Sequence, residues 1–189
     1  MRQTSCDRSL GDGVYFAPDD YIGLGPRIVV FVVDSIVLAS LLVLASLLWI
    51  ATLLCFNTIG DYPWTFLFFV ISLIWVYLVP LKRSDIRTLG FRTVGCKLVT
   101  LKGSRPSNSM LTFRTLLWMF GPCNFLLDFI WCGTDDDRQT MRDRFSNMCL
   151  IRNNAEPIGT GEIHLAYFNA FGYNLMYPRV VHPKAQATN

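Results

Sequence analysis

The stretch that decides the fold is Pro26–Phe56, which reads PRIVVFVVDSIVLASLLVLASLLWIATLLCF. Between Ile28 and Gly60 the only charged residue is Asp34. A helix needs about 20 mostly apolar residues to cross the hydrocarbon core of a bilayer, and this run is longer than that. The stretch therefore predicts a first transmembrane helix. Its start near Pro26 is favourable, because proline suits the first turn of a helix.

A second apolar run, Tyr62–Leu81, contains no charged residue. Its length is just sufficient for a span, and Trp64 and Tyr77 stand near its two ends, as aromatic side chains do at membrane interfaces. The short segment Asn57–Asp61 joins the two runs. We therefore expect two antiparallel transmembrane helices connected by a turn.

The basic residues set the expected orientation. Eight of the 17 lysines and arginines fall between Lys82 and Arg114, whereas the turn Asn57–Asp61 has none. The positive-inside rule places the basic segment and the N-terminus in the cytoplasm, with the helices in the plasma or inner membrane. Beside a bilayer such a cluster indicates retention on the cytoplasmic side, so we expect no nucleic-acid partner.

The third apolar stretch, Leu111–Gly133, allows two interpretations. It is interrupted by Gly121-Pro122 and carries Arg114 and Asp128. A single third span would place both charges at depth and move the later arginines to the far side. A re-entrant or interfacial hairpin that turns at Gly121-Pro122 avoids this and is favoured, with Arg114 and Asp128 at similar depth as a candidate pair. Broken helices are tolerated in membranes only where protein or water covers them.

Short runs on either side of this stretch predict local structure outside the membrane. Cys96–Leu101 and Met148–Arg152 resemble strands, and if they pair, both flanks lie on one side of the bilayer. Thr134 and the three aspartates after it predict a helix that reaches about Ser146, because a threonine cap and acids in the first turn stabilise a helix start. The tail after Arg152 has no clear period.

The expected fold class is an all-α membrane protein. It has two transmembrane helices, a third membrane-embedded helical segment that is re-entrant or spanning, short cytoplasmic strands and a short helix. The expected organisation is a polar segment at residues 1–20, a membrane domain at 21–152 and a tail at 153–189.

The charged residues and turns also form an ordered pattern. Arg27 stands at the start of the first helix and Asp34 lies within it. Thr88-Leu89-Gly90-Phe91-Arg92 and Gly95 follow the second helix, and Gly103–Ser107 precedes the third apolar stretch with its Arg114. Arg138-Gln139-Thr140-Met141-Arg142-Asp143 closes the pattern.

In this order and spacing, residues 21–152 resemble the RDD family, which is named for one arginine and two aspartates. The resemblance implies that Arg27, Asp34 and Asp143 are these three residues. The supporting charged and turn positions are Thr88, Gly90, Arg92, Gly95, Arg114 and Arg138, to which the third apolar stretch adds Asp128. The family implies a multi-pass membrane protein whose molecular role is mostly unassigned, with transport of ions or small solutes suggested.

Two function classes follow. The first is a transport module, expected as a homo-oligomer because two or three helices per chain rarely enclose a pathway alone. The alternative is an assembly or scaffold subunit that binds other membrane proteins through its basic cytoplasmic face. In both, the lipid bilayer is a partner.

Asp34 is the central candidate residue. A carboxylate seven residues into a membrane helix costs several kcal/mol if it faces lipid, so we expect it to face a partner. The favoured interpretation is a structural pair with an arginine of the basic segment. The other is a carboxylate that binds a proton or cation in a water-filled pocket.

Catalysis has little support in the sequence. The only histidines, His164 and His182, lie in the tail. There is no HExxH, GxSxG or Walker motif. We therefore expect no enzyme, no catalytic residue, no metal site and no cofactor.

The topology can be tested with single cysteines and a membrane-impermeant thiol reagent. A cysteine placed at Gly60 is expected to react from outside intact cells. Cysteines placed at Gly103 or Asn153 are expected to react only after the cells are permeabilised, because both termini are predicted to be cytoplasmic. Labelling at Asn153 from outside would instead indicate a full third span.

Overall fold

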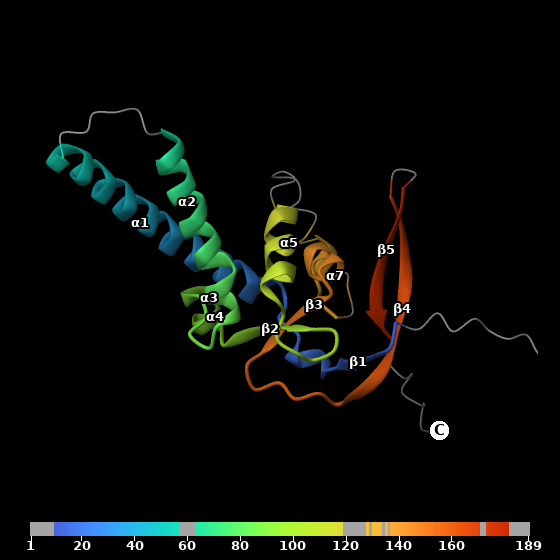
Figure 1. Cartoon of the computed structure of the whole chain (residues 1–189). Coiled ribbons are helices and arrows are strands. Elements are labelled where there is room, and N and C mark those ends of the chain that lie inside the picture. Colours follow the sequence, from blue (N-terminus) through green and yellow to red (C-terminus); the bar gives the residue numbers. More distant parts are fainter. Residues whose placement is uncertain are drawn as a thin grey trace, which may run out of the picture. The chain divides into compact units, whose positions relative to one another are not determined.

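The computed structural model describes residues 10–56, 63–118, 128, 130–133, 135, 137–170 and 173–181. The chain divides into two compact units. We call Gly25–Gly95 the helical unit, and Met1–Leu24 together with Cys96–Asn189 the sheet unit. Their helices and strands are labelled in Figure 1.

The helical unit contains the two predicted apolar helices. α1 is Leu24–Phe56 and α2 is Pro63–Leu78. Two helical segments of the described chain are long and apolar enough to cross a membrane: Leu24–Cys55, with a mean hydropathy of 2.8, and Trp64–Arg83, which includes α3, with a mean hydropathy of 2.2. Only 17% and 11% of their apolar windows are buried. Such low burial distinguishes them from core helices of a soluble domain, which bury most of their surface.

The second apolar helix ends earlier than its hydropathy predicts. α2 stops at Leu78, and α3 (Pro80–Arg83) follows as a separate turn. Pro80 has no backbone N–H and its ring clashes with the preceding turn, so it interrupts a helix that we expected to continue to Leu81. The predicted turn Asn57–Asp61 lies outside the described residues.

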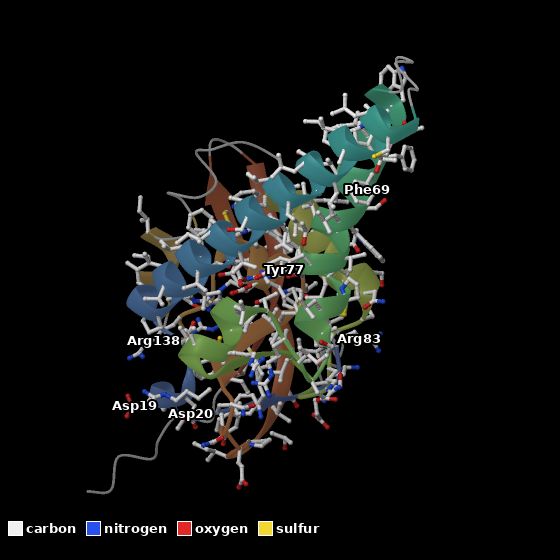
Figure 2. All side chains as sticks on the ribbon, turned by 90° about the vertical axis from the view of Figure 1, so that its left-hand side faces the viewer. Asp19, Asp20, Phe69, Tyr77, Arg83 and Arg138 are labelled. Carbon is white, nitrogen blue, oxygen red and sulfur yellow. The ribbon has the colours of Figure 1, made fainter. Side chains whose placement is uncertain are left out.

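Aromatic side chains connect α1 with α2. The ring centroid of Trp49 lies 5.6 Å from that of Phe66 and 6.4 Å from that of Phe69. Figure 2 shows Phe69, Tyr77 and Arg83 following one another along α2 and α3. The last helix of this unit, α4, is Leu89–Val94.

The sheet unit contains two antiparallel sheets. β2 (Cys96–Thr100) pairs with β3 (Met148–Arg152), from Cys96 opposite Arg152 to Thr100 opposite Met148. This pair confirms the two predicted strand runs. Both ends of the third apolar stretch are therefore held together by one sheet.

The second sheet joins the two ends of the chain. β1 (Asp12–Tyr15) pairs with β4 (Gly159–Ala170), which pairs with β5 (Tyr173–Val180), in the order β1-β4-β5. The all-α expectation is therefore wrong. The sequence of the tail shows no regular alternation of apolar and polar residues, because glycines and asparagines stand among its aromatic residues. The strand that completes its sheet, β1, lies far away in the sequence.

The helices of the sheet unit differ in part from the prediction. α5 is Asn108–Trp118, residues 130–133 are helical, and the Gly121-Pro122 turn lies outside the described residues. We predicted that the helix before β3 begins at Thr134, and this start is wrong, because α7 is Met141–Phe145. Arg138 takes a φ of 49°, which interrupts a helix. The cap is Thr140, which forms a capping box with Asp143.

Two hydrophobic clusters lie in the core of the sheet unit, among the residues that the structure describes. The larger consists of Phe16, Tyr21, Val99, Cys149, Ile151 and Ala155. The Tyr21 hydroxyl accepts a hydrogen bond from the Phe16 backbone N–H at 3.2 Å. Burial raises the pKa of Tyr21, so its hydroxyl stays neutral. The smaller cluster consists of Leu101, Ile163 and Val180.

The β1–β4 pair depends on two glycines that face each other. Gly13 is the register partner of Gly161. A Cβ at Gly161 would lie 2.2 Å from the Val181 carbonyl oxygen, and a Cβ at Gly13 would lie 2.6 Å from Cγ2 of Val180. Only glycine leaves room at these two positions for the Val180 side chain and the Val181 carbonyl group at the end of β5.

Gly161→Ala is expected to destabilise the sheet unit by about 1–3 kcal/mol, because the added methyl group meets backbone that cannot move aside cheaply. Thermal unfolding of the purified protein in detergent measures the change. Gly133→Ala is the matched control, because a Cβ there meets nothing within 4 Å. Equal melting temperatures for the two variants would contradict the prediction.

Candidate functional site

The carboxylate of Asp34 is the centre of a polar cluster within the helical unit. Its Oδ1 accepts hydrogen bonds from the Tyr77 hydroxyl and the Gly90 backbone N–H, both at 2.9 Å. Its Oδ2 accepts a hydrogen bond from the Thr88 hydroxyl at 3.0 Å and lies 3.6 Å from the Lys82 ammonium. Oδ1 therefore has two hydrogen-bond donors, and Oδ2 has one donor and a nearby cation. We call these five residues the Asp34 cluster.

The threonine and glycine after the second helix have separate roles in this cluster. Thr88 is fully buried and precedes α4, so its hydroxyl and the Gly90 N–H reach Asp34 together. A Cβ on Gly90 would lie 2.6 Å from the Val30 carbonyl oxygen and 2.7 Å from Oδ1 of Asp34. A glycine is required there, because any side chain would push α4 away from α1.

The cation of the cluster differs from the expected one. We expected an arginine of the basic segment to pair with Asp34, but the cation is Lys82 of α3. Its ammonium also lies 5.1 Å from the ring centroid of the buried Phe91. Lysine carries a compact charge on a flexible side chain, so it can approach a carboxylate whose oxygens already accept hydrogen bonds from other groups.

The remaining predicted positions of the helical unit have simpler roles. Arg27 is buried, as is Asp34 two turns further along α1. Arg92 is exposed in the last turn of α4, where a cation stabilises the helix dipole. Gly95 ends α4 with a φ of +67°, a conformation that favours glycine.

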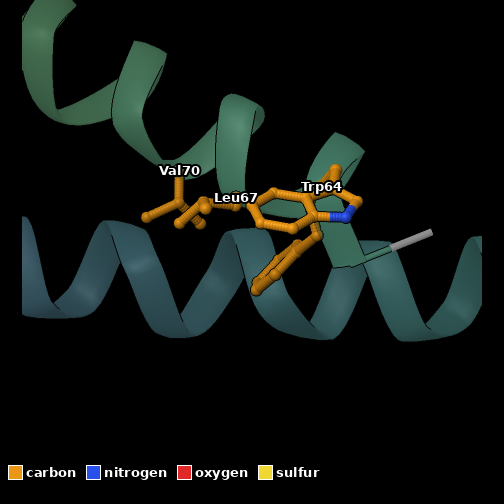
Figure 3. Close-up of a pocket in the computed structure, with 4 residues that line it drawn as sticks. Trp64, Leu67 and Val70 are labelled. Carbon is orange, nitrogen blue, oxygen red and sulfur yellow. The ribbon is translucent and has the colours of Figure 1, made fainter. Parts of the chain in front are cut away.

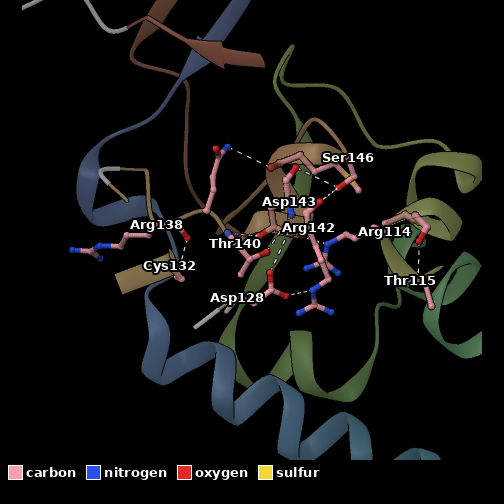
Figure 4. Close-up of polar contacts among 12 residues, drawn as sticks. Arg114, Thr115, Asp128, Cys132, Arg138, Thr140, Arg142, Asp143 and Ser146 are labelled. Carbon is pink, nitrogen blue, oxygen red and sulfur yellow. Dashed lines mark hydrogen bonds and ion pairs between the residues drawn. The ribbon is translucent and has the colours of Figure 1, made fainter. Parts of the chain in front are cut away.

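The third residue of the charged motif, Asp143, is the centre of a separate cluster in the sheet unit. Its side chain is fully buried and accepts a hydrogen bond from Nε of Arg114 in α5 at 2.7 Å. It also accepts one from the Thr140 backbone N–H at 3.4 Å, and the Thr140 hydroxyl in turn accepts one from the Asp143 N–H. Figure 4 shows Asp143 beside Thr140 and Arg114. The ion pair connects α5 with α7.

Asp128 does not pair with Arg114, so the expected pair within the third apolar stretch is wrong. Asp128 is buried and instead pairs with Nε of Arg142 on α7 (Figure 4). Similarly, Asp135 pairs with the buried Arg144. The arginines of α7 therefore bind acids of the preceding segment, and Arg114 remains for Asp143.

Burial makes these charges mutually dependent. It raises the pKa of the Asp128 carboxyl, which the charge of Arg142 counteracts. It also lowers the pKa of the Arg142 guanidinium. Because desolvation disfavours an isolated charge on either side, removing one partner leaves the other in an unfavourable place.

Arg138 lies apart from the buried acids. Its guanidinium donates to the Tyr21 carbonyl oxygen at 3.3 Å, and its own carbonyl oxygen accepts a bond from the Cys132 thiol. Arg138 therefore connects the segment before α1 with the segment before α7, within the sheet unit. No three potential metal-ligating side chains come together among the residues that the structure describes.

A model of the RDD family matches residues 21–147. The chain belongs to the RDD family. This confirms the resemblance seen in the sequence, and the family together with the two apolar helices indicates a membrane protein. No curated protein and no solved structure matches the chain.

The geometry divides the RDD residues between the two units. Asp34 has its donors in the helical unit, and Asp143 has its donors in the sheet unit. Sequence reasoning missed Tyr77, which we interpreted only as an interfacial aromatic, and Lys82, which we counted only as basic. The signal for both was the need of Asp34 for partners near the end of the second apolar run, which follows from the cost of a buried charge.

Asp34→Asn is expected to lower the stability of the RDD protein by about 3 kcal/mol, because Lys82, whose side chain is only 13% exposed, loses its counter-charge and an amide NH₂ meets existing donors. Thermal unfolding in detergent measures the loss. The double variant Asp34→Asn with Lys82→Met should recover part of it, because both charges are then gone. A single variant as stable as the wild type would contradict the structural role.

Arg114→Met is expected to destabilise the protein by about 3 kcal/mol, because the fully buried Asp143 loses its cation. Lys102→Met is the matched control, since Lys102 is exposed. The pair Arg114→Met with Asp143→Asn should regain stability relative to Arg114→Met. Equal unfolding temperatures for Arg114→Met and Lys102→Met would show that the ion pair contributes nothing.

Proposed function

We propose that this RDD-family chain is a multi-pass protein of a cell membrane and acts as an assembly subunit. In this proposal, α1 and α2 cross the bilayer, both termini are cytoplasmic, and the outer face of α2 binds transmembrane helices of further copies. The observation that carries the proposal is the high exposure of both helices, of which only 17% and 11% of the apolar windows are buried.

The shape of the exposed surface supports association with protein. Trp64, Phe66, Leu67 and Val70 line an open apolar recess of about 460 Å³ at the N-terminal end of α2 (Figure 3). Trp64 itself is 76% exposed. Without a hydrophobic driving force between helices in lipid, association depends on close packing, and a recess gives a protruding side chain of a neighbouring helix many contacts.

Transport of an ion or small solute is the second candidate. It is supported by the buried contact of 3.6 Å between Lys82 and Asp34, since paired charges within membrane helices often belong to proton or ion pathways. The other donors weigh against it. Both oxygens of Asp34 also accept hydrogen bonds from uncharged groups of the same unit, so a substrate would have to displace existing partners.

The copy number in the membrane tests the assembly proposal. The full chain, labelled with one fluorophore and extracted in polymer nanodiscs, is expected to show two or more bleaching steps per particle. Leu67→Trp fills the recess and should weaken association about tenfold, which corresponds to roughly 1.4 kcal/mol. Ile36→Trp is the control, because Ile36 is 61% exposed on α1 and lies outside the recess.

A single bleaching step for the wild type would contradict the assembly proposal. Cation flux, measured in proteoliposomes of the same preparation, distinguishes the transport candidate from the assembly proposal. Cation flux that Asp34→Asn abolishes in a correctly folded protein would favour transport.

A further inference from the structure

The β4–β5 hairpin has one packed face and one open face. On the packed face, the ring centroid of Tyr177 lies 6.4 Å from that of Trp131 and 4.7 Å from Cζ of Arg144. The open face presents Leu165, Tyr167 and Met176, which are 41%, 63% and 55% exposed. Alternate strand residues point to the same side, so these three side chains share one surface.

This open face continues an apolar stripe that begins in the core. Ile163 pairs with Val180 at the base of the hairpin, and both are buried with Leu101. The next pairs on the same side are Leu165 with Pro178 and Tyr167 with Met176. The stripe therefore leaves the core and remains apolar where nothing in the described chain covers it.

The distal part of the hairpin also lacks the charges that strands exposed to water usually carry. Residues 165–178 contain no Asp, Glu, Lys or Arg. β5 is an edge strand of its sheet. Soluble proteins protect such edges with charged side chains, especially lysine, because an uncharged edge strand pairs with other chains. An edge strand that lies in an apolar environment does not need those charges.

α5 presents a second apolar surface in the same unit. Arg114 turns inward to Asp143, whereas Phe113 and Leu116 are 48% and 50% exposed, and Trp118 is 43% exposed at the end of the helix. In Figure 1 the C-terminal end of α5 and the distal part of the hairpin both point to the top of the view, away from β1. One end of the sheet unit is therefore apolar on two separate elements.

We infer that this end of the sheet unit inserts into the surface of the lipid bilayer, with the open face of the β4–β5 hairpin and the outer face of α5 among the acyl chains and headgroups. The inference rests on the membrane location in the proposed function. Tyrosine and tryptophan favour this interface, because their rings are apolar and their polar atoms reach water. We call Leu165, Tyr167, Met176, Phe113 and Leu116 the insertion surface.

Two observations favour lipid over a second copy of the chain as the occupant. A second copy that adds a strand to β5 would cover the hairpin but would leave α5 exposed. A bilayer covers both, because it is a continuous surface. In addition, the sheet unit has no linker to the apolar helices: α1 begins at Leu24 and β2 begins directly after Gly95. The unit therefore remains beside any membrane that α1 and α2 cross.

Photo-crosslinking of the full chain in its native membrane tests the inference. Benzoylphenylalanine is introduced at Tyr167, Met176 or Phe113, and the mass of the irradiated, purified protein identifies the adduct. Ile36 on α1 is the positive control, and Glu162 on the other side of β4, 66% exposed by its side chain, is the negative control. We expect lipid adducts at the three test positions, with about tenfold higher yield than at Glu162.

Each other outcome overturns the inference. A crosslinked dimer at Tyr167 or Met176 would identify a second copy as the occupant, and an adduct with another protein would identify a foreign partner. Yields equal to that at Glu162 would show that the hairpin faces water. If Ile36 also gives no lipid adduct, the membrane location fails together with the inference. If Ile36 gives the adduct and the hairpin does not, only the inference fails.

Discussion

A carboxylate within an apolar helix has to find donors, and this requirement organises the helical unit. Asp34 lies among side chains that cannot bind it, so its partners come from the segments that follow: the Tyr77 hydroxyl, the Lys82 ammonium, the Thr88 hydroxyl and the Gly90 N–H. Together they connect α1 with the end of α2, with α3 and with α4. Two apolar helices alone lack a specific register, and a single buried charge with directed donors supplies one.

The sheet unit solves the same problem with arginines. Asp143, Asp128 and Asp135 each pair with a different arginine, and two of these arginines lie on the short helix α7. A helix of this length has little intrinsic stability in water. Its ion pairs and its capping box therefore determine its position more than its propensity does. The family motif thus has one physical meaning in both units, because each aspartate is buried where several elements meet.

The sequence predicted the features that depend on local composition. The apolar runs identified α1 and α2, and the β-branched residues beside the third stretch identified β2 and β3. Arg27, Asp34 and Asp143 were recognised from their order, and their burial follows from the cost of charge in apolar surroundings. Partners could not be predicted in the same way. Arg114 and Asp128 have suitable spacing for a pair, but Arg142 and Asp143 compete for them from another element, and a choice among equal charges depends on tertiary position.

The β1-β4-β5 sheet could not be predicted from local sequence patterns, for a related reason. The four residues of β1 are too few to show a period, and two of the four β4 residues that pair with β1 are glycines, Gly159 and Gly161. The evidence for pairing therefore lies in steric fit between distant segments. Only the assembled backbone shows why Gly13 and Gly161 have to be glycines.

This pairing also has a consequence for biosynthesis. β1 leaves the ribosome before the apolar helices, whereas β4 is among the last segments to be translated. Loop closure over nearly the whole chain is slow, so β1 remains unpaired while the two apolar helices are synthesised. A chain that ends after α7 would contain both apolar helices but an incomplete sheet. Such an edge is the kind of surface that chaperones and proteases of the cell recognise in unfinished proteins.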